Sequence, residues 1–262
     1  MMWDDLKRLG QFKDLLVTMT LRDIQVRYKQ TFLGAAWAVA QPLAFMLILA
    51  SLKSLVFRES MSEGVPHTIF LYCAMVPWMF FQSGLTFATT SVSGNMNLVK
   101  KIYFPREIFP AASILACVVD FAIASVIFVG MMAWYRIPFT ASLLWVPVLF
   151  LVELVFVLAA GLFIAASNVF YRDVKYLVPL SVQLLLFASP VIYSVAQVPE
   201  SLRPWYQLNP MAVVIDGFRK AILHGTAPDL GVLGASLAVA LLLCAAAYVY
   251  FKRVEAKFAD LI

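Results

Sequence analysis

Residues 22–57 read RDIQVRYKQTFLGAAWAVAQPLAFMLILASLKSLVF. The stretch begins with a basic-aromatic segment, 22–29, and continues into an apolar run that starts near Phe32. A run of about 20 apolar residues crosses the roughly 30 Å of bilayer hydrocarbon as a helix, because a helix satisfies its backbone hydrogen bonds internally. The stretch therefore predicts a membrane helix that meets the cytoplasm at a basic edge.

Further apolar stretches follow, and the composition agrees with a membrane protein. Of the 262 residues, 63% are hydrophobic and 13% are charged, whereas soluble domains carry roughly 45–50% apolar and about 25% charged residues. A β-barrel would show alternating hydrophobicity instead of continuous apolar runs. We expect an all-α integral membrane protein with one transmembrane domain, 1–262, and six spans within 31–252, near 32–57, 68–93, 108–134, 143–170, 177–196 and 230–251.

The distribution of basic residues sets the orientation of these spans. Cytoplasmic loops carry an excess of Lys and Arg. With the N-terminus inside, the inner segments hold most of the 20 basic residues, and the outer side keeps Lys53, Arg58, Arg136, Arg203, Arg219 and Lys220. We therefore expect both termini in the cytoplasm and a multi-pass protein of the plasma (inner) membrane.

Residues 3–21 have the pattern of an amphipathic helix, which with the entry segment makes up residues 1–30 before the first span. Its apolar side chains recur at helical spacing, at Trp3, Leu6, Leu9, Phe12, Leu16 and Met19. The pattern predicts a helix that lies in the membrane interface. Packing of the same apolar face on the protein's own cytoplasmic side is the alternative, and both arrangements can hold together.

The segment 197–229 interrupts the series of spans. Its apolar part is too short and too charged to cross a bilayer, and prolines divide it into short pieces, at Pro199, Pro204 and Pro210. We expect a re-entrant or interfacial helical hairpin on the outer face. An ordinary outer loop with one surface helix is the alternative.

Two carboxylates fall near the middle of expected spans, Asp120 in the third and Glu153 in the fourth. Ionisable side chains are costly in a bilayer, so each is a functional candidate by default. Facing a water-filled interior, they could bind a polar cargo or couple transport to protons. The simpler alternative is polar contact between helices.

The cytoplasmic loop between the second and third spans, 95–107, mixes cations with apolar side chains. A loop that only sets topology needs the charges alone. This loop adds a second, apolar set, made by Leu98, Val99, Ile102, Tyr103 and Phe104. The combination predicts a short helix that docks into a groove of a partner.

Several chemistries lack their sequence signals. There is no Gly-x-x-x-x-Gly-Lys-Ser/Thr loop for ATP and no Cys/His/carboxylate cluster with metal-ligand spacing, so we expect neither a cofactor nor a metal in this chain. The net charge of +5 comes from residues at span ends. It therefore indicates topology and contact with anionic membrane lipids, not nucleic-acid binding.

Five segments resemble polysaccharide-exporting ABC transporter permeases, which export O-antigen, capsule or teichoic acid. They are, in chain order, residues 22–42, KIYFPRE at 101–107, YRDV at 171–174, SPVIY at 189–193 and LNP at 208–210. Because these segments run over nearly the whole chain in the right order, the match is specific for the family. It does not separate the family's substrates.

The resemblance implies a fold and a set of partners. It implies six spans, an interfacial N-terminal helix and gate helices between the fifth and sixth spans. Two copies of the chain would form the channel. Two separate nucleotide-binding subunits would bind ATP and Mg and hydrolyse the ATP, so this chain would be a transporter subunit and not an enzyme. The cargo would be an undecaprenyl-pyrophosphate-linked polysaccharide exported from the cytoplasm, with lipopolysaccharide O-antigen preferred over capsule or teichoic acid.

The resemblance also implies roles for residues. The lipid pyrophosphate would meet cations that donate charge-assisted hydrogen bonds, and these access residues would be Arg22, Arg27, Tyr28 and Lys29; lipid headgroup anchoring is the alternative. Coupling to the ATPase would fall to Asn97, Lys100, Lys101, Tyr103, Pro105, Arg106 and Glu107. The outer gate would contain Trp205, Tyr206, Asn209 and Pro210. Channel-facing candidates are Asp120 and Glu153.

Other classes of protein compete with this interpretation. A proton-coupled secondary transporter would use Asp120 and Glu153, but it predicts inverted repeats, and the two halves show no convincing similarity. A membrane-embedded glycosyltransferase or phosphatase would need clustered acidic or His residues at one membrane face, which the loops lack. A permease of the same family for drugs or small lipids is a further alternative.

Overall fold

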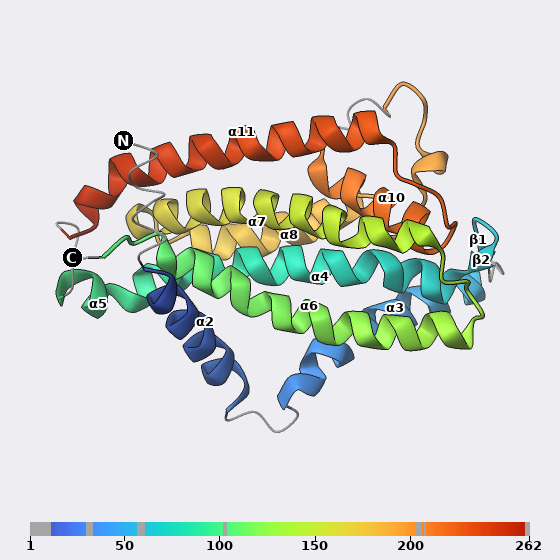
Figure 1. Cartoon of the computed structure of the whole chain (residues 1–262), viewed down its shortest axis with the longest axis horizontal. Helices are drawn as coiled ribbons and strands as arrows, with labels where there is room; N and C mark the ends of the chain where they lie inside the picture. Colours follow the sequence, from blue (N-terminus) through green and yellow to red (C-terminus); the bar gives the residue numbers. More distant parts are fainter. Residues whose placement is uncertain are drawn as a thin grey trace.

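A bundle of long helices lies along one axis in the computed structural model of the chain (Figure 1). The structure describes residues 12–29, 34–56, 61–101, 104–202, 206 and 208–259. The long helices alternate in direction along the chain, and they are α3 (Trp37–Val56), α4 (His67–Ser91), α6 (Ile108–Trp134), α7 (Trp145–Phe170), α8 (Val174–Ala188) and α11 (Leu230–Glu255). A short antiparallel hairpin of β1 (Met61–Ser62) and β2 (Val65–Pro66) precedes α4.

Four of the described helices are long and apolar enough to cross a membrane. These segments are His67–Ser91, Ile108–Trp134, Ala141–Phe170 and Leu230–Phe258. They coincide with the second, third, fourth and sixth expected spans, which confirms an all-α multi-pass membrane protein. The shorter apolar helices are Trp37–Leu52 and Val174–Ala188. The first and fifth spans, and with them the count of six, stay predictions.

The end of α8 differs from the expected span 177–196. The helix stops at Ala188, and Ser189 is extended with φ −105° and ψ 152°. Pro190 follows Ser189 in the sequence. A residue before proline is driven out of the α region because it clashes with the proline ring. The expected boundary was therefore wrong, although the Ser-Pro pair that causes the difference is visible in the sequence.

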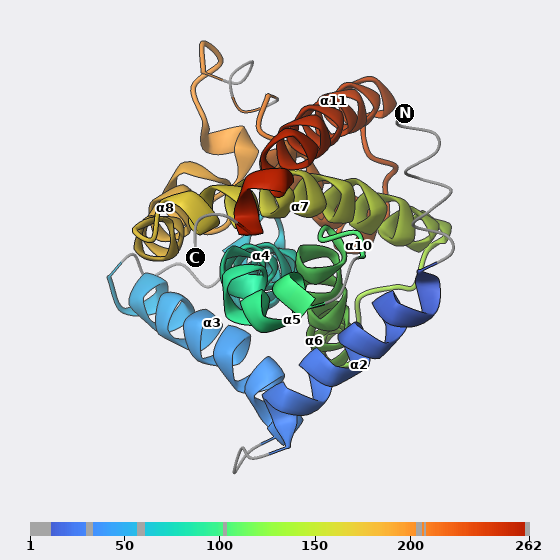
Figure 2. The same ribbon diagram turned by 90° about the vertical axis from the view of Figure 1, so that its left-hand side faces the viewer.

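Helix α4 occupies the centre of the bundle. Viewed along the bundle, α3, α6, α7 and α8 surround it (Figure 2). Its side chains are accordingly buried, with Phe70 and Trp78 each 1% exposed. The outer helices instead expose large apolar side chains, among them Leu184, Phe187 and Leu242. Such faces are stable where lipid tails or another apolar surface covers them.

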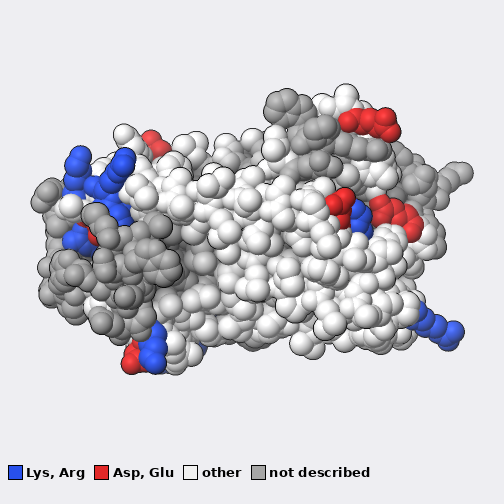
Figure 3. All heavy atoms as spheres, turned by 45° about the horizontal axis from the view of Figure 1, so that its top comes forward, with Lys and Arg blue, Asp and Glu red and all other residues white. Residues whose placement is uncertain are grey.

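Charged side chains gather at the two ends of the molecule. On the face shown in Figure 3, the described Lys, Arg, Asp and Glu residues leave the middle band uncharged. One end carries α5 (Met96–Lys101) and the last turns of α11, and the other carries the β-hairpin and α10 (Pro210–Ile222). This banding is the pattern of a protein whose central surface meets hydrocarbon.

Close packing of α4 on α7 depends on a missing side chain at Gly84. A Cβ placed there would lie 2.6 Å from Cγ1 of Val157. Valine is branched at Cβ and stiff at χ1, so it cannot turn away easily. Helices α4 and α7 therefore approach closely at this point because position 84 is glycine.

We expect Gly84→Ala to lower the free energy of unfolding by about 1–3 kcal/mol, the usual cost of overpacking a core. Gly130→Ala is the matched control, because Gly130 also lies within a helix and a Cβ there would meet nothing within 4 Å. The control should be neutral or stabilise the chain by up to about 1 kcal/mol. Unfolding in mixed detergent micelles measures both changes, and equal effects would contradict this packing role.

Candidate functional site

Helix α2 (Lys13–Tyr28) carries the basic-aromatic segment and packs along α6. In Figure 2, α2 and α3 diverge from a common corner and flank α6 and α4. One side of α2 packs against an apolar cluster at the α5 end of the bundle, through Phe12, Leu15, Leu16 and Met19. These residues therefore pack against the rest of the chain. Trp3, Leu6 and Leu9 lie outside the described residues, and the position of α2 in the membrane interface stays a prediction.

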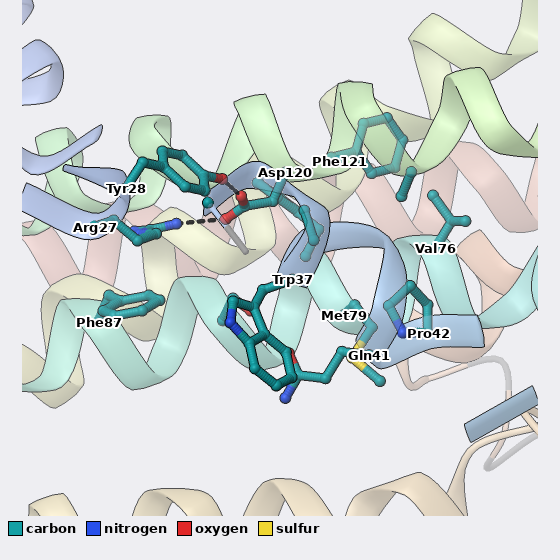
Figure 4. A pocket seen from close by; sticks show the side chains of 15 residues that line it. Arg27, Tyr28, Trp37, Gln41, Pro42, Val76, Met79, Phe87, Asp120 and Phe121 are labelled. Atoms are coloured by element: carbon teal, nitrogen blue, oxygen red, sulfur yellow. Dashed lines mark hydrogen bonds and ion pairs between the residues drawn. The ribbon is translucent and has the colours of Figure 1, made fainter. Parts of the chain in front are cut away.

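Three side chains from α2 and α6 form a charged cluster. Arg27 Nη1 lies 2.5 Å from Asp120 Oδ2, and the Tyr28 hydroxyl donates to the other Asp120 oxygen (Figure 4). The Arg27 guanidinium also lies 3.9 Å from the centre of the Phe87 ring. Its two terminal nitrogens lie 3.6 Å from the sulfur of Cys117. The Arg27 and Asp120 side chains are only 16% and 22% exposed, so this ion pair is largely withdrawn from solvent.

A cavity of about 260 Å³ lies beside this cluster, between α2, α3, α4 and α6 (Figure 4). Arg27 and Asp120 supply its charged wall, and its other polar and aromatic lining includes Gln41, Ser83, Trp37 and Phe87. Sites for small molecules usually measure about 300–1,000 Å³. The cavity therefore has room for one charged head group or one ring, and not for a polymer.

The other two predicted access residues lie elsewhere. Arg22 donates through Nη1 to Asn95 Oδ1 at 3.0 Å and through Nε and Nη2 to its neighbour Asp23. Asp23 in turn accepts a hydrogen bond of 2.8 Å from Ser113 of α6. Lys29 is exposed. The structure thus brings Arg27 and Tyr28 to the cavity, whereas Arg22 ties α2 to the segment that precedes α5.

Glu153 occupies a different environment from Asp120. It is fully buried, and neither carboxylate oxygen has a hydrogen-bond partner among the described residues. One turn away on either side lie Leu149, which abuts Gly217 of α10, and Val157, which abuts Gly84 of α4. Glu153 therefore faces the junction of α7 with α4 and α10. The two predicted channel-facing acids do not form one site.

The predicted coupling segment is anchored to the end of α11. Glu107 is 4% exposed, and Lys252 Nζ lies 2.9 Å from its carboxylate. Arg106 donates to the backbone carbonyl of Glu255. Asn97 is exposed and Pro105 is half-buried. The side chains of Lys100 and Lys101, and the whole of Tyr103, lie outside the described residues, so contact with an ATPase stays a prediction.

The predicted outer-gate segment contains one described α-helix, α10. Asn209 caps it by accepting a 3.1 Å hydrogen bond from the Met211 N–H. The same side chain donates to Ser189 Oγ at 3.1 Å, and the hydroxyls of Tyr206 and Tyr193 are hydrogen-bonded. Pro210 is the first residue of α10, where its missing N–H costs nothing. Trp205 lies outside the described residues, and a gating role stays a prediction.

Arg219 of α10 is a buried structural cation that the sequence analysis counted only among the basic residues of the outer side. It is 2% exposed. It donates to three carbonyl groups of the turn after α8, those of Pro190 at 2.6 Å, Val191 at 2.7 Å and Tyr193 at 2.9 Å. Burial lowers the pKa of Arg219 to about 10, which still leaves it charged at neutral pH.

The arrangement that joins these features is a bundle of apolar helices with α2 packed along α6 and a capped helix, α10, at the end that carries the β-hairpin. Comparison with known families identifies the family of the chain, because the family model described as ABC-2 type transporter matches residues 14–223. The chain belongs to the ABC-2 type transporter family. A chain of this family is a permease subunit that pairs with ABC ATPase subunits, and it is not an enzyme.

Three relatives of this ABC-2 transporter chain are informative. It is 30% identical to the O-antigen export system permease protein RfbA of Klebsiella pneumoniae, over 83% of both chains. It is 28% identical to the protein of the same name from Myxococcus xanthus, over 98% of both chains. The polysialic acid transport protein KpsM of Escherichia coli is 21% identical, over 78% of this chain and 80% of that protein.

Segments of this ABC-2 transporter chain that are distant in sequence meet in the structure. The 189–193 segment is held by α10 through Ser189 and the three carbonyls that Arg219 binds. The 22–29 segment is held by α6 through Asp120. No spacing rule could find these contacts, because each joins residues from helices that are separated in the chain.

Proposed function

We propose that this chain is the membrane subunit of an ABC exporter that moves a lipid-linked polysaccharide from the cytoplasm to the outer side of the membrane. The observation that carries the proposal is the cavity that presents Arg27 between α2 and α3, in a chain whose relatives are named for O-antigen export over up to 98% of its length. Lipopolysaccharide O-antigen is the first candidate, and capsule or teichoic acid is the alternative.

The chemistry of the cavity supports a phosphate-bearing cargo. An arginine fork matches the oxygens of a phosphate group and binds them through charge-assisted hydrogen bonds. Trp37 and Phe87 add aromatic surface to the same cavity. An undecaprenyl pyrophosphate head group would therefore meet the cation of Arg27 here. Arg22 lies on the same helix, and Lys29 follows directly after it.

The size of the cavity supports an oligomeric exporter. A cavity of about 260 Å³ is too small to enclose a polymer, so we place the conduit between chains. We propose a homodimer of this chain with two ATPase subunits that bind ATP and Mg. It would lie in the inner membrane with both termini in the cytoplasm and six spans per chain. The segment 95–107 would contact the ATPase, and the region around α10 would form the outer gate.

Reconstitution tests this proposal. We expect proteoliposomes that hold the chain and its ATPase subunits to move an undecaprenyl-diphosphate-linked glycan only when ATP is present. The measurement is the fraction of glycan that becomes accessible to a hydrolase added on the receiving side. Transport by the chain alone on a proton gradient would refute the proposal and favour a secondary transporter.

A substitution at Glu153 separates the two classes further. In an ATP-driven exporter, Glu153→Gln should leave the transport rate within about threefold, because the amide keeps the shape of a fully buried side chain. In a proton-coupled transporter, the same change removes an intramembrane ionisable group and abolishes transport. The initial transport rate at saturating ATP decides between them.

A further inference from the structure

Arg27, the cation of the proposed head-group site, is already paired with an acidic residue of the same chain. Asp120 places one carboxylate oxygen 2.5 Å from Arg27 Nη1, and its other oxygen accepts from Tyr28. Figure 4 shows this contact at the wall of the cavity, with Arg27 and Asp120 pointing toward one another. Among the described residues, Asp120 is the only oxygen acceptor that Arg27 contacts.

The geometry of this ion pair leaves most of the guanidinium unused. Arg27 engages Asp120 through one nitrogen, and within the described part of the chain its second terminal nitrogen contacts only the thiol of Cys117, a weak acceptor. The stronger arrangement for arginine is bidentate, with two parallel N–H···O bonds to one anion. A diphosphate carries more charge than a carboxylate and can offer two oxygens at once, so it can replace Asp120.

Burial explains why a counter-ion is present when the site is empty. The Arg27 side chain is 16% exposed and covered on one side by the Phe87 ring. A cation withdrawn from water and left without a partner is strongly destabilising. Asp120 removes this cost in the empty transporter. When a ligand displaces it, Asp120 keeps the hydrogen bond from Tyr28 and is not left without a partner.

We propose that Asp120 is a displaceable internal counter-ion that competes with the diphosphate head group for Arg27 and so sets the affinity of the site. The inference rests on the proposed function, because it assigns the ligand of the same cavity. Asp120 is then a specificity-determining residue. Only an anion that engages Arg27 more strongly than one carboxylate oxygen displaces Asp120, and the phosphodiester of an ordinary membrane phospholipid, which carries a single negative charge, binds less well.

A double-mutant cycle tests this competition in the transporter assembled with its ATPase subunits in nanodiscs. The proteins are wild type, Asp120→Asn, Arg27→Gln and the double variant. Binding of undecaprenyl diphosphate, undecaprenyl monophosphate and inorganic pyrophosphate is measured by native mass spectrometry. We expect Asp120→Asn to bind undecaprenyl diphosphate about tenfold more tightly than wild type, and Arg27→Gln to bind it at least about tenfold more weakly.

The outcomes separate competition from the alternatives. A gain that disappears in the Arg27→Gln background supports the proposal, since Asp120 then acts through Arg27. A gain that persists there overturns it, because removing any negative charge would then suffice. Unchanged or weaker binding by Asp120→Asn also overturns it, because Asp120 would then only hold Arg27 in position. Tighter binding of inorganic pyrophosphate but not of the lipid would move the ligand from a membrane head group to a soluble anion, against the proposal.

Two controls keep the result specific. Asp216→Asn removes a carboxylate from another ion pair, 2.8 Å from Lys220 in α10 and outside the lining of the cavity, and should leave binding unchanged. Thermal unfolding of each variant excludes misfolding, and the double variant, in which neither charge is left unpaired, serves where a single variant is unstable. ATP-dependent glycan export by the wild-type transporter tests the proposed function independently. If the wild type does not export the glycan, the proposed function is wrong. If it exports the glycan but Asp120→Asn binds the lipid no more tightly, only the competition between Asp120 and the diphosphate is wrong.

Discussion

Arg219→Met is expected to lower the free energy of unfolding by about 3–5 kcal/mol, among the largest effects a single substitution can have. The substitution keeps an apolar stem of similar length but removes all donors to the carbonyls of Pro190, Val191 and Tyr193. A buried polar group that loses its partner costs about 1–3 kcal/mol. The contact with the Phe70 ring, 3.6 Å from the guanidinium carbon, is also lost.

The neighbouring residue provides the control for this prediction. Lys220→Met removes an exposed cation that pairs with Asp216 at 2.8 Å, and a surface pair of this kind contributes about 0–1 kcal/mol. Arg219→Lys should fall between the two, because one ammonium cannot reproduce a planar fork of donors. Unfolding in mixed micelles measures the three variants. A loss below about 1 kcal/mol for Arg219→Met would show that Arg219 does not hold the turn after α8.

Lys252→Met is expected to destabilise the chain by about 3–5 kcal/mol, because it leaves a buried carboxylate without its ion pair. Glu107 is 4% exposed and lies 2.9 Å from Lys252. The remaining Tyr248 hydroxyl, 3.5 Å from Glu107, is too distant to replace the ammonium group. The same measurement of unfolding in mixed micelles applies.

Removing both charges together should restore most of this stability. The double variant Glu107→Gln/Lys252→Met leaves no fully buried ion unpaired, although the half-buried Glu255 loses its 3.2 Å contact with Lys252, and replacing a buried pair by neutral groups is often close to neutral. Lys257→Met, one turn further along on an exposed position, should change stability by less than about 0.5 kcal/mol. If the double variant were as unstable as Lys252→Met, the ion pair would not be what joins the 104–107 segment to α11.

The apolar helices were the part of the fold that the sequence predicted well. The third expected span, 108–134, has the bounds of α6, because a continuous apolar run of that length has few alternatives to a helix in a bilayer. The end of α8 was misplaced by treating 177–196 as one run. There, local backbone sterics at Ser189 overrode hydrophobicity.

The candidate site was predicted in composition and not in arrangement. Arg27, Tyr28 and Asp120 were each singled out, but in two unrelated roles, and the structure joins them in one cluster. Asp120 and Glu153 looked equivalent in sequence because both lie mid-helix. They differ because each lies on a helix face that meets different neighbouring helices. Those neighbours depend on how the helices pack, and no local sequence pattern reveals the packing.

The importance of Arg219 could not be seen in a count of charges. A cation near the end of an amphipathic segment usually marks a solvated face. Here its partners are backbone carbonyl groups, which every residue possesses, so no sequence pattern distinguishes them. One feature of the sequence did point to this region. The Ser-Pro pair at 189–190 predicts a turn, and the carbonyl groups of a turn need hydrogen-bond donors.

The early stop of α8 has a consequence for the thickness of the barrier beside it. A helix of 15 residues is about 22 Å long, several ångströms less than the roughly 30 Å of hydrocarbon. Beyond Ala188 the chain is irregular, and its carbonyl oxygens accept hydrogen bonds from the guanidinium of Arg219. Irregular backbone at that depth is tolerated only against protein or a wet hollow. In the proposed six-span arrangement, the hydrocarbon layer would therefore be thinner beside the far end of α8 than beside the four long apolar helices.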